Sequence, residues 1–230
     1  SLTERFDKST ERKLIDIAVI RLPRISNFTD FSPFERYGNV SLRYVDSVGD
    51  LHQPDMIILP GTKSTIADLR WLRQCGLEAA IHKAADAGTL VFGVCGGYQM
   101  LGRTVSDPEQ VEAAGTTEIL GMGLLEMDTI FLGEKVQAQT TGVFAGISGV
   151  LSDLNGMSYS GYEIHMGRSE EEMPALAGTG NVYGSYVHGV FDASGISDTI
   201  LKALCVRKGI DFDALETFDI SEYKEHQYDL

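Results

Sequence analysis

The chain has 230 residues, of which 43% are hydrophobic and 23% charged, and its formal net charge is −14. This composition is ordinary for a globular protein, and the length suits one domain with a sizeable core. The acidic balance opposes contact with phosphate backbones, which needs clustered lysine and arginine. No apolar stretch approaches the roughly 20 residues that span a bilayer, and the N-terminal residues lack a signal-peptide pattern. We therefore expect neither nucleic acid nor a membrane as a partner.

The cysteines and the first residues indicate the setting of the domain. Cys75, Cys95 and Cys205 are too few and too widely spaced for a disulfide framework or a zinc knuckle. A reducing, cytoplasmic compartment is the natural expectation. Residues 1–13 are polar and aperiodic, and we interpret them as a linker or as the cut edge of a longer protein. Residues 14–230 are then expected to form a single domain.

Strand and helix patterns alternate through the first half of the chain. Apolar runs predict strands over residues 15–22, 40–45, 56–59 and 89–94. Apolar residues at helical spacing, followed by glycine, predict helices over residues 65–74 and 77–87. A further short helix is expected near residues 34–37, where Ser32-Pro33 forms a helix start signal. This alternation predicts an α/β fold with an open, mostly parallel sheet flanked by helices.

The second half of the chain has a different character. From residue 119 to about 190, glycine is frequent, helix signals fade, and short runs such as YEIHM and YGSYVHGVF predict strands. A late helix is predicted over residues 197–208, and the acidic tail from Asp211 onward is expected to be solvated. The C-terminal half is therefore predicted to be rich in β-structure.

Cys95 is the first candidate for chemistry. It lies in Gly93-Val94-Cys95-Gly96-Gly97, which has the form of a nucleophile elbow with cysteine in the place of serine. Such a turn puts the nucleophile at a helix N-terminus, which favours the thiolate, and the N–H of Gly96 could face an oxyanion. The pattern alone fits a structural cysteine in a glycine-rich turn equally well.

A cysteine nucleophile needs a base, and His188 is the candidate. It ends an apolar strand beside a glycine, where a side chain emerges from a sheet edge, although a strand-end histidine is often only structural. Glu163 and His165 share one face of another predicted strand and could interact there. They could line a pocket or form a pair on a solvated face. No further ligand is positioned by spacing, so we expect no metal site.

A second backbone donor is expected at Gly61. The sequence Leu59-Pro60-Gly61-Thr62 ends a predicted parallel strand before a helix. Ligands of open α/β sheets bind at this edge, so the N–H of Gly61 could complete an oxyanion site with Gly96. The following Lys63-Ser64 is no phosphate-binding loop, because the upstream glycine spacing is missing.

Several motifs together resemble a known family. LPGT at 59–62, GVCGGYQMLG at 93–102 and YVHGVF at 186–191 are similar to the motifs of class I, triad-type glutamine amidotransferases. The segments at 19–35 (VIRLPRISNFTDFSPFE) and 161–168 (GYEIHMGR) further resemble the cobyric acid synthase family of cobalamin biosynthesis. The resemblance runs from about residue 15 to the end of the chain. It implies the flavodoxin-like fold of class I glutamine amidotransferases.

The resemblance also implies a reaction. In that family Cys95 would attack the carboxamide of L-glutamine and His188 would protonate the departing ammonia, with Gln99 and its neighbour Tyr98 contacting the substrate. The ammonia would pass to an ATP-dependent synthetase domain of the same protein, which amidates corrin carboxylates. This chain would then need no cofactor, and ATP and Mg²⁺ would serve the synthetase domain.

The chain departs from the class pattern at Val190, where most triad enzymes carry glutamate two residues after the catalytic histidine. The group that orients His188 is therefore open, and Glu163 is the candidate. We expect slow glutamine hydrolysis without the synthetase domain. Three alternatives remain: the related a,c-diamide synthase, a cysteine hydrolase acting on another amide or ester, and a docking module that has lost catalysis.

Overall fold

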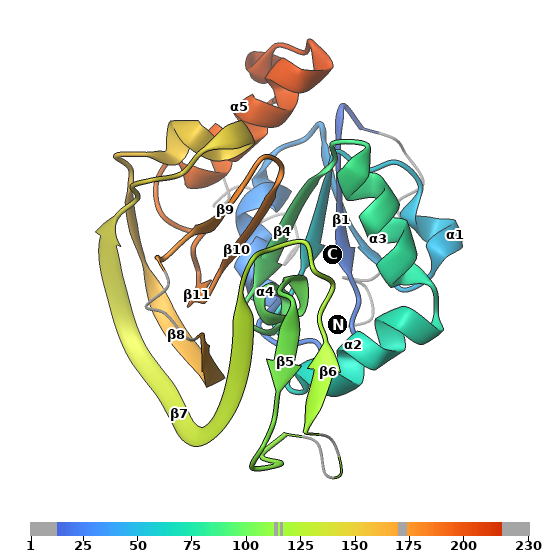
Figure 1. The fold of residues 1–230 in the computed structure, drawn as a ribbon. Helices are drawn as coiled ribbons and strands as arrows, with labels where there is room; N and C mark the ends of the chain where they lie inside the picture. Colours follow the sequence, from blue (N-terminus) through green and yellow to red (C-terminus); the bar gives the residue numbers. More distant parts are fainter. Residues whose placement is uncertain (1–12, 113–114, 116, 170–173, 218–230) are drawn as a thin grey trace, which may run out of the picture.

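A six-stranded sheet forms the centre of the molecule, with the strand order β2-β1-β3-β4-β10-β9 (Figure 1). The computed structural model describes residues 13–217 except 113–114, 116 and 170–173. Within this sheet β9 pairs antiparallel with β10, and the other pairs are parallel. The strands are β1 (Ile15–Ile20), β2 (Val40–Val45), β3 (Met56–Leu59), β4 (Leu90–Val94), β9 (Ala177–Thr179) and β10 (Val182–Ser185). The predicted parallel sheet is therefore confirmed.

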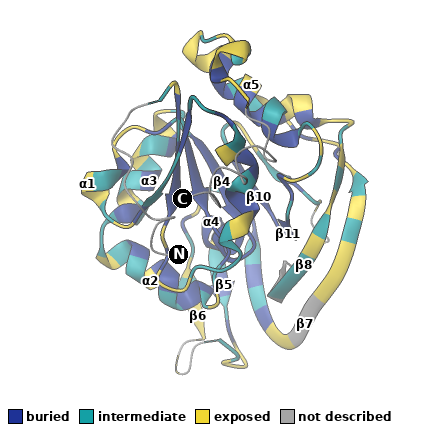
Figure 2. Ribbon diagram, turned by 180° about the vertical axis from the view of Figure 1, so that it is seen from behind, coloured by how far each residue is buried: buried dark blue, intermediate teal, exposed yellow. Residues whose placement is uncertain are grey.

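Helices cover both faces of this sheet. Alternate residues of β1 belong to two hydrophobic clusters, with Ile17 and Val19 in one and Ala18 and Ile20 in the other. The first cluster includes residues of the 3₁₀ helix η2 and of α5, and the second includes residues of α1 to α4. The helices are α1 (Val48–Leu51), α2 (Thr65–Gln74), α3 (Leu77–Asp86), α4 (Gly96–Leu101) and α5 (Ile196–Lys208), with 3₁₀ helices η2 (Phe28–Arg36), η3 (Gly149–Leu154) and η4 (Phe212–Leu215). In Figure 2 the central strands are buried, as expected for a sheet covered on both faces.

A second, five-stranded sheet stands beside the first, with the order β11-β8-β7-β5-β6. Its long antiparallel strands β7 and β8 form the curved ribbon at the left of Figure 1. The strands are β5 (Thr104–Ser106), β6 (Glu118–Leu120), β7 (Asp128–Val143), β8 (Ser158–Ser169) and β11 (Val187–His188). This sheet confirms the β-rich second half of the chain.

Two local predictions were wrong. The short helix does not begin at Ser32-Pro33; η2 starts at Phe28, because Asn27 takes a left-handed conformation (φ 51°) that asparagine tolerates. The tail after Asp211 is not wholly solvated, since η4 buries Leu215, which is 1% exposed. The chain from 218 onward lies outside the described residues.

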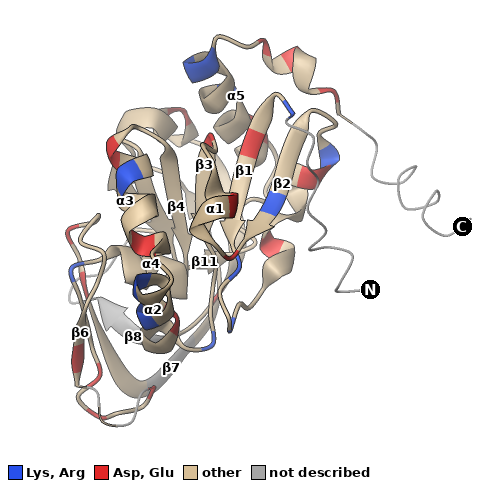
Figure 3. Ribbon diagram, turned by 90° about the vertical axis from the view of Figure 1, so that its right-hand side faces the viewer, with Lys and Arg blue, Asp and Glu red and all other residues tan. Residues whose placement is uncertain are grey.

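Charged residues are distributed over the whole fold. Figure 3 shows acidic and basic positions scattered over the helices and strands of one side, with no basic stretch among them. Among the helices of the described part of the chain, none is long and apolar enough to cross a membrane. The absence of nucleic acid and membrane partners stays a prediction.

Candidate active site

Four loops meet at the carboxyl edge of the central sheet. Strands β1, β3, β4 and β10 all end at this edge. The loops that follow them contain the motifs identified in the sequence, such as LPGT after β3 and the Cys95 turn after β4. Cys95 directly follows β4, and its backbone N–H donates to the carbonyl oxygen of Ser185 at the end of β10 (2.8 Å). The parallel topology therefore brings the cysteine and histidine segments together, although about 90 residues separate them in sequence.

Cys95 sits in a strained turn, as the nucleophile-elbow pattern predicts. Its φ is +51° and its ψ −111°, a backbone conformation that costs a non-glycine residue about 1–3 kcal/mol. It is the N-cap residue of α4, and it is 7% exposed. The Cys95 thiol donates to the carbonyl oxygen of Ile164 on β8 (3.5 Å). Strain of this kind is typical of residues held in place for function.

The glycines around Cys95 are required by close backbone contacts. A Cβ atom at Gly93 would lie 2.7 Å from the carbonyl oxygen of Gly97, and a Cβ at Gly97 would clash with the carbonyl oxygen of Leu59. Helix α4 can approach β4 at Gly93 and β3 at Gly97 this closely only because neither position carries a side chain.

His188 contacts both Cys95 and a buried carboxylate. Its Nδ1 lies 2.7 Å from Oδ2 of Asp30, and the two side chains are 1% and 5% exposed. Burial alone lowers the pKa of His188, but the hydrogen bonds and charges of Asp30 and Cys95 outweigh burial and raise this pKa to about 9. The imidazole is therefore protonated at neutral pH.

Asp30 is the residue that sequence reasoning missed. It belongs to η2, and its other oxygen accepts a hydrogen bond from the backbone N–H of Gly189 (3.3 Å). Its neighbour in the site is Asn27, whose amide nitrogen lies 3.0 Å from His188 Nδ1. The one available signal was position, because the segment that carries both residues follows β1 at the carboxyl edge of the sheet.

Glu163 contacts another histidine in the structure. Its Oε2 lies 3.4 Å from Nε2 of His165, so the predicted same-face interaction of these two residues is confirmed. The ring of His165 stacks on Tyr186, with 4.1 Å between ring centroids. The carboxylate that contacts His188 is that of Asp30, and Glu163 lies across the strand pair from Val187.

The ring of Tyr162 packs over the ring of His188. It pairs with His188 across β8 and β11, and the two rings stack with 5.3 Å between centroids and 25° between planes. The tyrosine is 37% exposed. It therefore lies between the histidine and solvent.

The predicted oxyanion donors lie close to the reacting side chains. A Cβ at Gly61 would lie 3.1 Å from Cε1 of His188, and a Cβ at Gly96 would lie 2.6 Å from the methyl group of Thr62. The loop after β3 is thus in contact with both His188 and the elbow. The structure brings Gly61 and Gly96 together at the site, and their role as donors stays a prediction.

Gln99 and Tyr98 are both buried. Gln99 is 2% exposed, and its Oε1 accepts a hydrogen bond from the hydroxyl of Thr65 (2.9 Å). Tyr98 is 0% exposed and meets the ring of Tyr186 edge-on, with 5.0 Å between centroids. A Cβ at Gly184 would clash with the Tyr98 ring, so this tyrosine packs against β10. Substrate contact by either residue stays a prediction.

Among the residues that the structure describes, no group of three or more histidine, cysteine or acidic side chains is placed to hold a metal ion; the absence of a metal site stays a prediction. Cys75 is partly buried and Cys205 is buried in the first hydrophobic cluster, which fits their interpretation as small apolar residues. The role of Cys95 and His188 as the reactive pair stays a prediction.

Comparisons with known proteins agree with this geometry. The profile of the CobB/CobQ-like glutamine amidotransferase domain family matches residues 16–196. The cobyric acid synthase of Lachnoclostridium phytofermentans is 50% identical over 254 aligned positions, which cover 100% of this chain and 49% of that protein. That of Ruminiclostridium cellulolyticum is 46% identical, over 100% of this chain and 48% of that protein. The chain thus spans about half the length of the curated relatives it matches.

Solved structures support the fold. A crystal structure of a glutamine amidotransferase superposes with a TM-score of 0.57 at 17% identity, covering 82% of this chain and 98% of that one. The structure titled PurLQS from Thermotoga maritima gives a TM-score of 0.56 at 19% identity, covering 83% of this chain and 99% of that one. At these identities the likeness concerns the fold alone.

Proposed function

The chain belongs to the CobB/CobQ-like glutamine amidotransferase domain family, and on this premise we propose that it releases ammonia from L-glutamine within a cobyric acid synthase. The observation that carries the proposal is the buried pair of His188 and Asp30, 2.7 Å apart, at the sheet edge where the strained Cys95 follows β4 and bonds to the end of β10. A strained cysteine beside a protonated histidine is an arrangement suited to thiolate attack on a carboxamide.

The first half of the proposed reaction forms a thioester. The Cys95 thiolate attacks the side-chain carbonyl carbon of glutamine, and the N–H groups of Gly61 and Gly96 stabilise the oxyanion. One donor of this kind is typically worth about 3–4 kcal/mol of barrier. As the tetrahedral intermediate collapses, the C–N bond breaks and the His188 imidazolium gives its proton to the leaving nitrogen. Ammonia departs, and a γ-glutamyl thioester remains on the cysteine.

The second half regenerates the enzyme. Neutral His188 takes a proton from a water molecule as the water oxygen attacks the thioester carbonyl. The C–S bond then breaks, glutamate leaves, and the thiolate–imidazolium pair is restored. Asp30 touches no reacting atom; it holds the His188 ring and stabilises the imidazolium, the role of the third member of a triad. Asp30 thereby replaces the glutamate that Val190 does not supply.

The destination of the ammonia is proposed from the relatives. Cobyric acid synthases are about twice as long as this chain, which leaves room for a synthetase domain in the same protein. That domain would use ATP and Mg²⁺ to activate corrin carboxylates, while the glutaminase site itself would need no cofactor. The names of the relatives favour cobyric acid synthase over the sister a,c-diamide synthase.

The test is glutamate release, measured for the wild-type chain with and without the synthetase half of a relative. We expect slow release alone, faster release with the synthetase half, and none above background from Cys95→Ala. Cys75→Ala is the matched control, because this partly buried cysteine caps the C-terminal end of α2, and it should keep wild-type activity. Absence of glutamate release and of Cys95 acylation by an electrophilic glutamine analogue, even with the synthetase half present, would contradict the proposal.

A further inference from the structure

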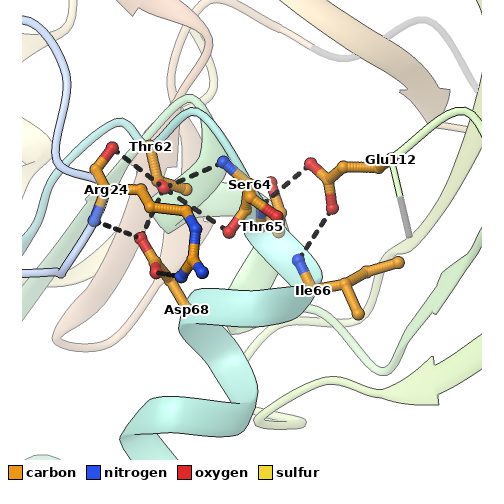
Figure 4. A network of polar contacts seen from close by, with 7 residues as sticks. All are labelled: Arg24, Thr62, Ser64, Thr65, Ile66, Asp68 and Glu112. Carbon is orange, nitrogen blue, oxygen red and sulfur yellow. Dashed lines mark hydrogen bonds and ion pairs between the residues drawn. The ribbon is translucent and has the colours of Figure 1, made fainter. Parts of the chain in front are cut away.

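Asp68 is a buried carboxylate that the proposed mechanism does not use. It lies on α2 and is 0% exposed. Its Oδ2 accepts hydrogen bonds from the hydroxyl of Thr62 (2.6 Å) and from the backbone N–H of Arg24 (3.1 Å), and its Oδ1 pairs with the Arg24 guanidinium at 2.9 Å (Figure 4). Both oxygens of Asp68 thus accept hydrogen bonds, whereas a carboxamide in this place would have only one acceptor oxygen.

The partners of Asp68 belong to the two loops that build the active site. Arg24 lies in the loop after β1 that leads to Asp30, and Thr62 directly follows Gly61 in the loop after β3. Backbone hydrogen bonds hold the two loops side by side: Lys63 N–H donates to the carbonyl oxygen of Arg24 (3.0 Å). Asp68 thus ties both loops to a single helix.

The helix that carries Asp68 is itself fixed at its first turn. The N–H groups of Thr65 and Ile66 donate to the two carboxylate oxygens of Glu112, each at 2.8 Å (Figure 4). These bonds satisfy backbone donors that a helix N-terminus otherwise leaves unpaired. Helix α2 therefore offers a rigid base from which Asp68 can hold Thr62.

Thr62 is the link between Asp68 and the reacting groups. Its methyl group lies against Gly96, where a Cβ would come within 2.6 Å, and its neighbour Gly61 lies against His188. A shift of Thr62 would therefore move the backbone at both predicted oxyanion donors. Misplacement of a stabilising group by about 1 Å is enough to cost on the order of 10²-fold in rate.

We propose that Asp68 is a positioning residue for glutamine hydrolysis, which holds the loop of Gly61 and Thr62 where the oxyanion forms. The inference rests on the proposed function. It concerns transition-state stabilisation, so it predicts a loss in kcat with little change in KM. It also predicts that the intrinsic reactivity of the Cys95 thiolate is unaffected, since alkylation by iodoacetamide forms no oxyanion.

The experiment compares Asp68→Asn with a matched variant at the opposite edge of the sheet. Asp16 accepts hydrogen bonds from Ser41 (2.8 Å) and Arg43 (2.7 and 2.8 Å), and it lies near the start of β1, away from the site. Asp16→Asn removes a comparable ion pair without touching either loop. Thr62→Val serves as a milder second variant, because it deletes the hydroxyl that contacts Asp68 and keeps the backbone.

Glutamate release, Cys95 alkylation and thermal unfolding are measured for each protein with the synthetase half of a relative present. We expect kcat to fall on the order of 10²-fold in Asp68→Asn and about tenfold in Thr62→Val, and the double variant to be no worse than Asp68→Asn. In both variants the alkylation rate should stay within about twofold of wild type. Asp16→Asn should lower the unfolding temperature and leave kcat within about twofold of wild type.

The outcomes separate this inference from the proposed function. An active wild type with an equally active Asp68→Asn would overturn the inference alone. So would an equal loss in Asp16→Asn, or a loss of alkylation in parallel with hydrolysis, because either would indicate general destabilisation. If Asp68→Asn does not fold, a Thr62→Val protein that is folded and fully active overturns the inference. A wild type that neither releases glutamate nor is acylated would overturn the proposed function, and the inference with it.

Discussion

Two histidine–carboxylate pairs lie on the β8–β11 side of the molecule, and they differ in almost every physical respect. His188 and Asp30 are 2.7 Å apart, and their side chains are 1% and 5% exposed. His165 and Glu163 are 3.4 Å apart, and their side chains are 7% and 26% exposed. The Asp30–His188 pair is therefore closer and less exposed to solvent than the Glu163–His165 pair. A hydrogen bond between charged groups is stronger when solvent is excluded, so the first pair is expected to be the more stabilising.

The pairs also differ in what surrounds the histidine. His188 contacts Cys95, and its pKa is raised by that contact and by Asp30, whereas His165 stacks on the ring of Tyr186. Asp30 and His188 are 158 residues apart in sequence, but Glu163 and His165 are two apart. The sequence spacing thus makes the Glu163–His165 pair visible, whereas the tertiary fold alone creates the pair of Asp30 and His188.

The largest predicted difference in kcat is between variants of His188 and variants of His165. His188→Asn should lower kcat for glutamate release by about 10²–10⁴-fold, because the proton donor and acceptor is lost. His165→Asn, its matched control on β8, should change kcat by less than about fivefold, since it removes a packing contact. Steady-state kinetics with unfolding temperatures checks both, and an equal loss in the two variants would remove the distinction.

Substitution of Asp30 should likewise lower kcat more than substitution of Glu163, although both effects should be smaller than those of the histidine variants. Asp30→Asn should lower kcat by about 10–10²-fold, because His188 loses the partner that orients it and stabilises its charge. Glu163→Gln should stay within about threefold of wild type, since the partially exposed contact with His165 contributes little. Should Glu163→Gln prove the more damaging of the two, Glu163 rather than Asp30 would be the orienting residue.

The pH profile should sharpen the comparison further. The raised pKa of His188 keeps the imidazolium populated up to about pH 9, so glutamate release should decline above that pH as the proton donor is lost. Asp30→Asn removes an anion that favours the charged ring, and the alkaline decline should therefore begin at lower pH. Rates at saturating glutamine between pH 6 and 10 measure the shift, and an unchanged alkaline limb would contradict it.

The smallest expected effect is on stability. Because the folded-state pKa of His188 is raised above its ordinary value, its contribution to folding is fully present below about pH 6.5 and is lost as pH rises through about 9. Urea unfolding at pH 6 and pH 9.5 should therefore differ more in the wild type than in Asp30→Asn. Equal pH dependence in the two proteins would argue against a buried pair.

Helices and strands of the N-terminal half could be predicted because their hydrophobic pattern in the sequence matches their burial in the fold. A run of fully buried apolar residues predicts β3 (Met56–Leu59) with its observed bounds. The strand pattern of residues 40–45 likewise predicts β2 (Val40–Val45), and helical spacing predicts α2 (Thr65–Gln74). The elbow of Cys95 could also be predicted from a local pattern, because the glycines that its turn requires adjoin it in sequence. Such features need no knowledge of distant residues.

Other features depend on contacts that local patterns cannot contain. Asp30 looks like a polar residue of a surface loop until η2 brings it against His188. Asp68 looks like a solvated helix residue until the loops of Arg24 and Thr62 close over it. Burial of both carboxylates arises only when β1, β3 and β10 end at the same edge of the sheet. The positions of Cys95 and His188 at one edge of the sheet could thus be predicted, and the two buried carboxylates could not.

A direct titration of His188 tests the central claim, that Asp30 is the buried partner of the proposed catalytic histidine. Labelled histidine ring signals are followed by NMR from pH 5 to 10 in the wild type, Asp30→Asn and Glu163→Gln, with His188→Asn to assign the resonance. We predict a pKa of about 9 in the wild type, a lower pKa in Asp30→Asn, and the wild-type pKa in Glu163→Gln. A wild-type His188 that titrates near the ordinary value of about 6.5, or one that Asp30→Asn leaves unchanged, would contradict this account.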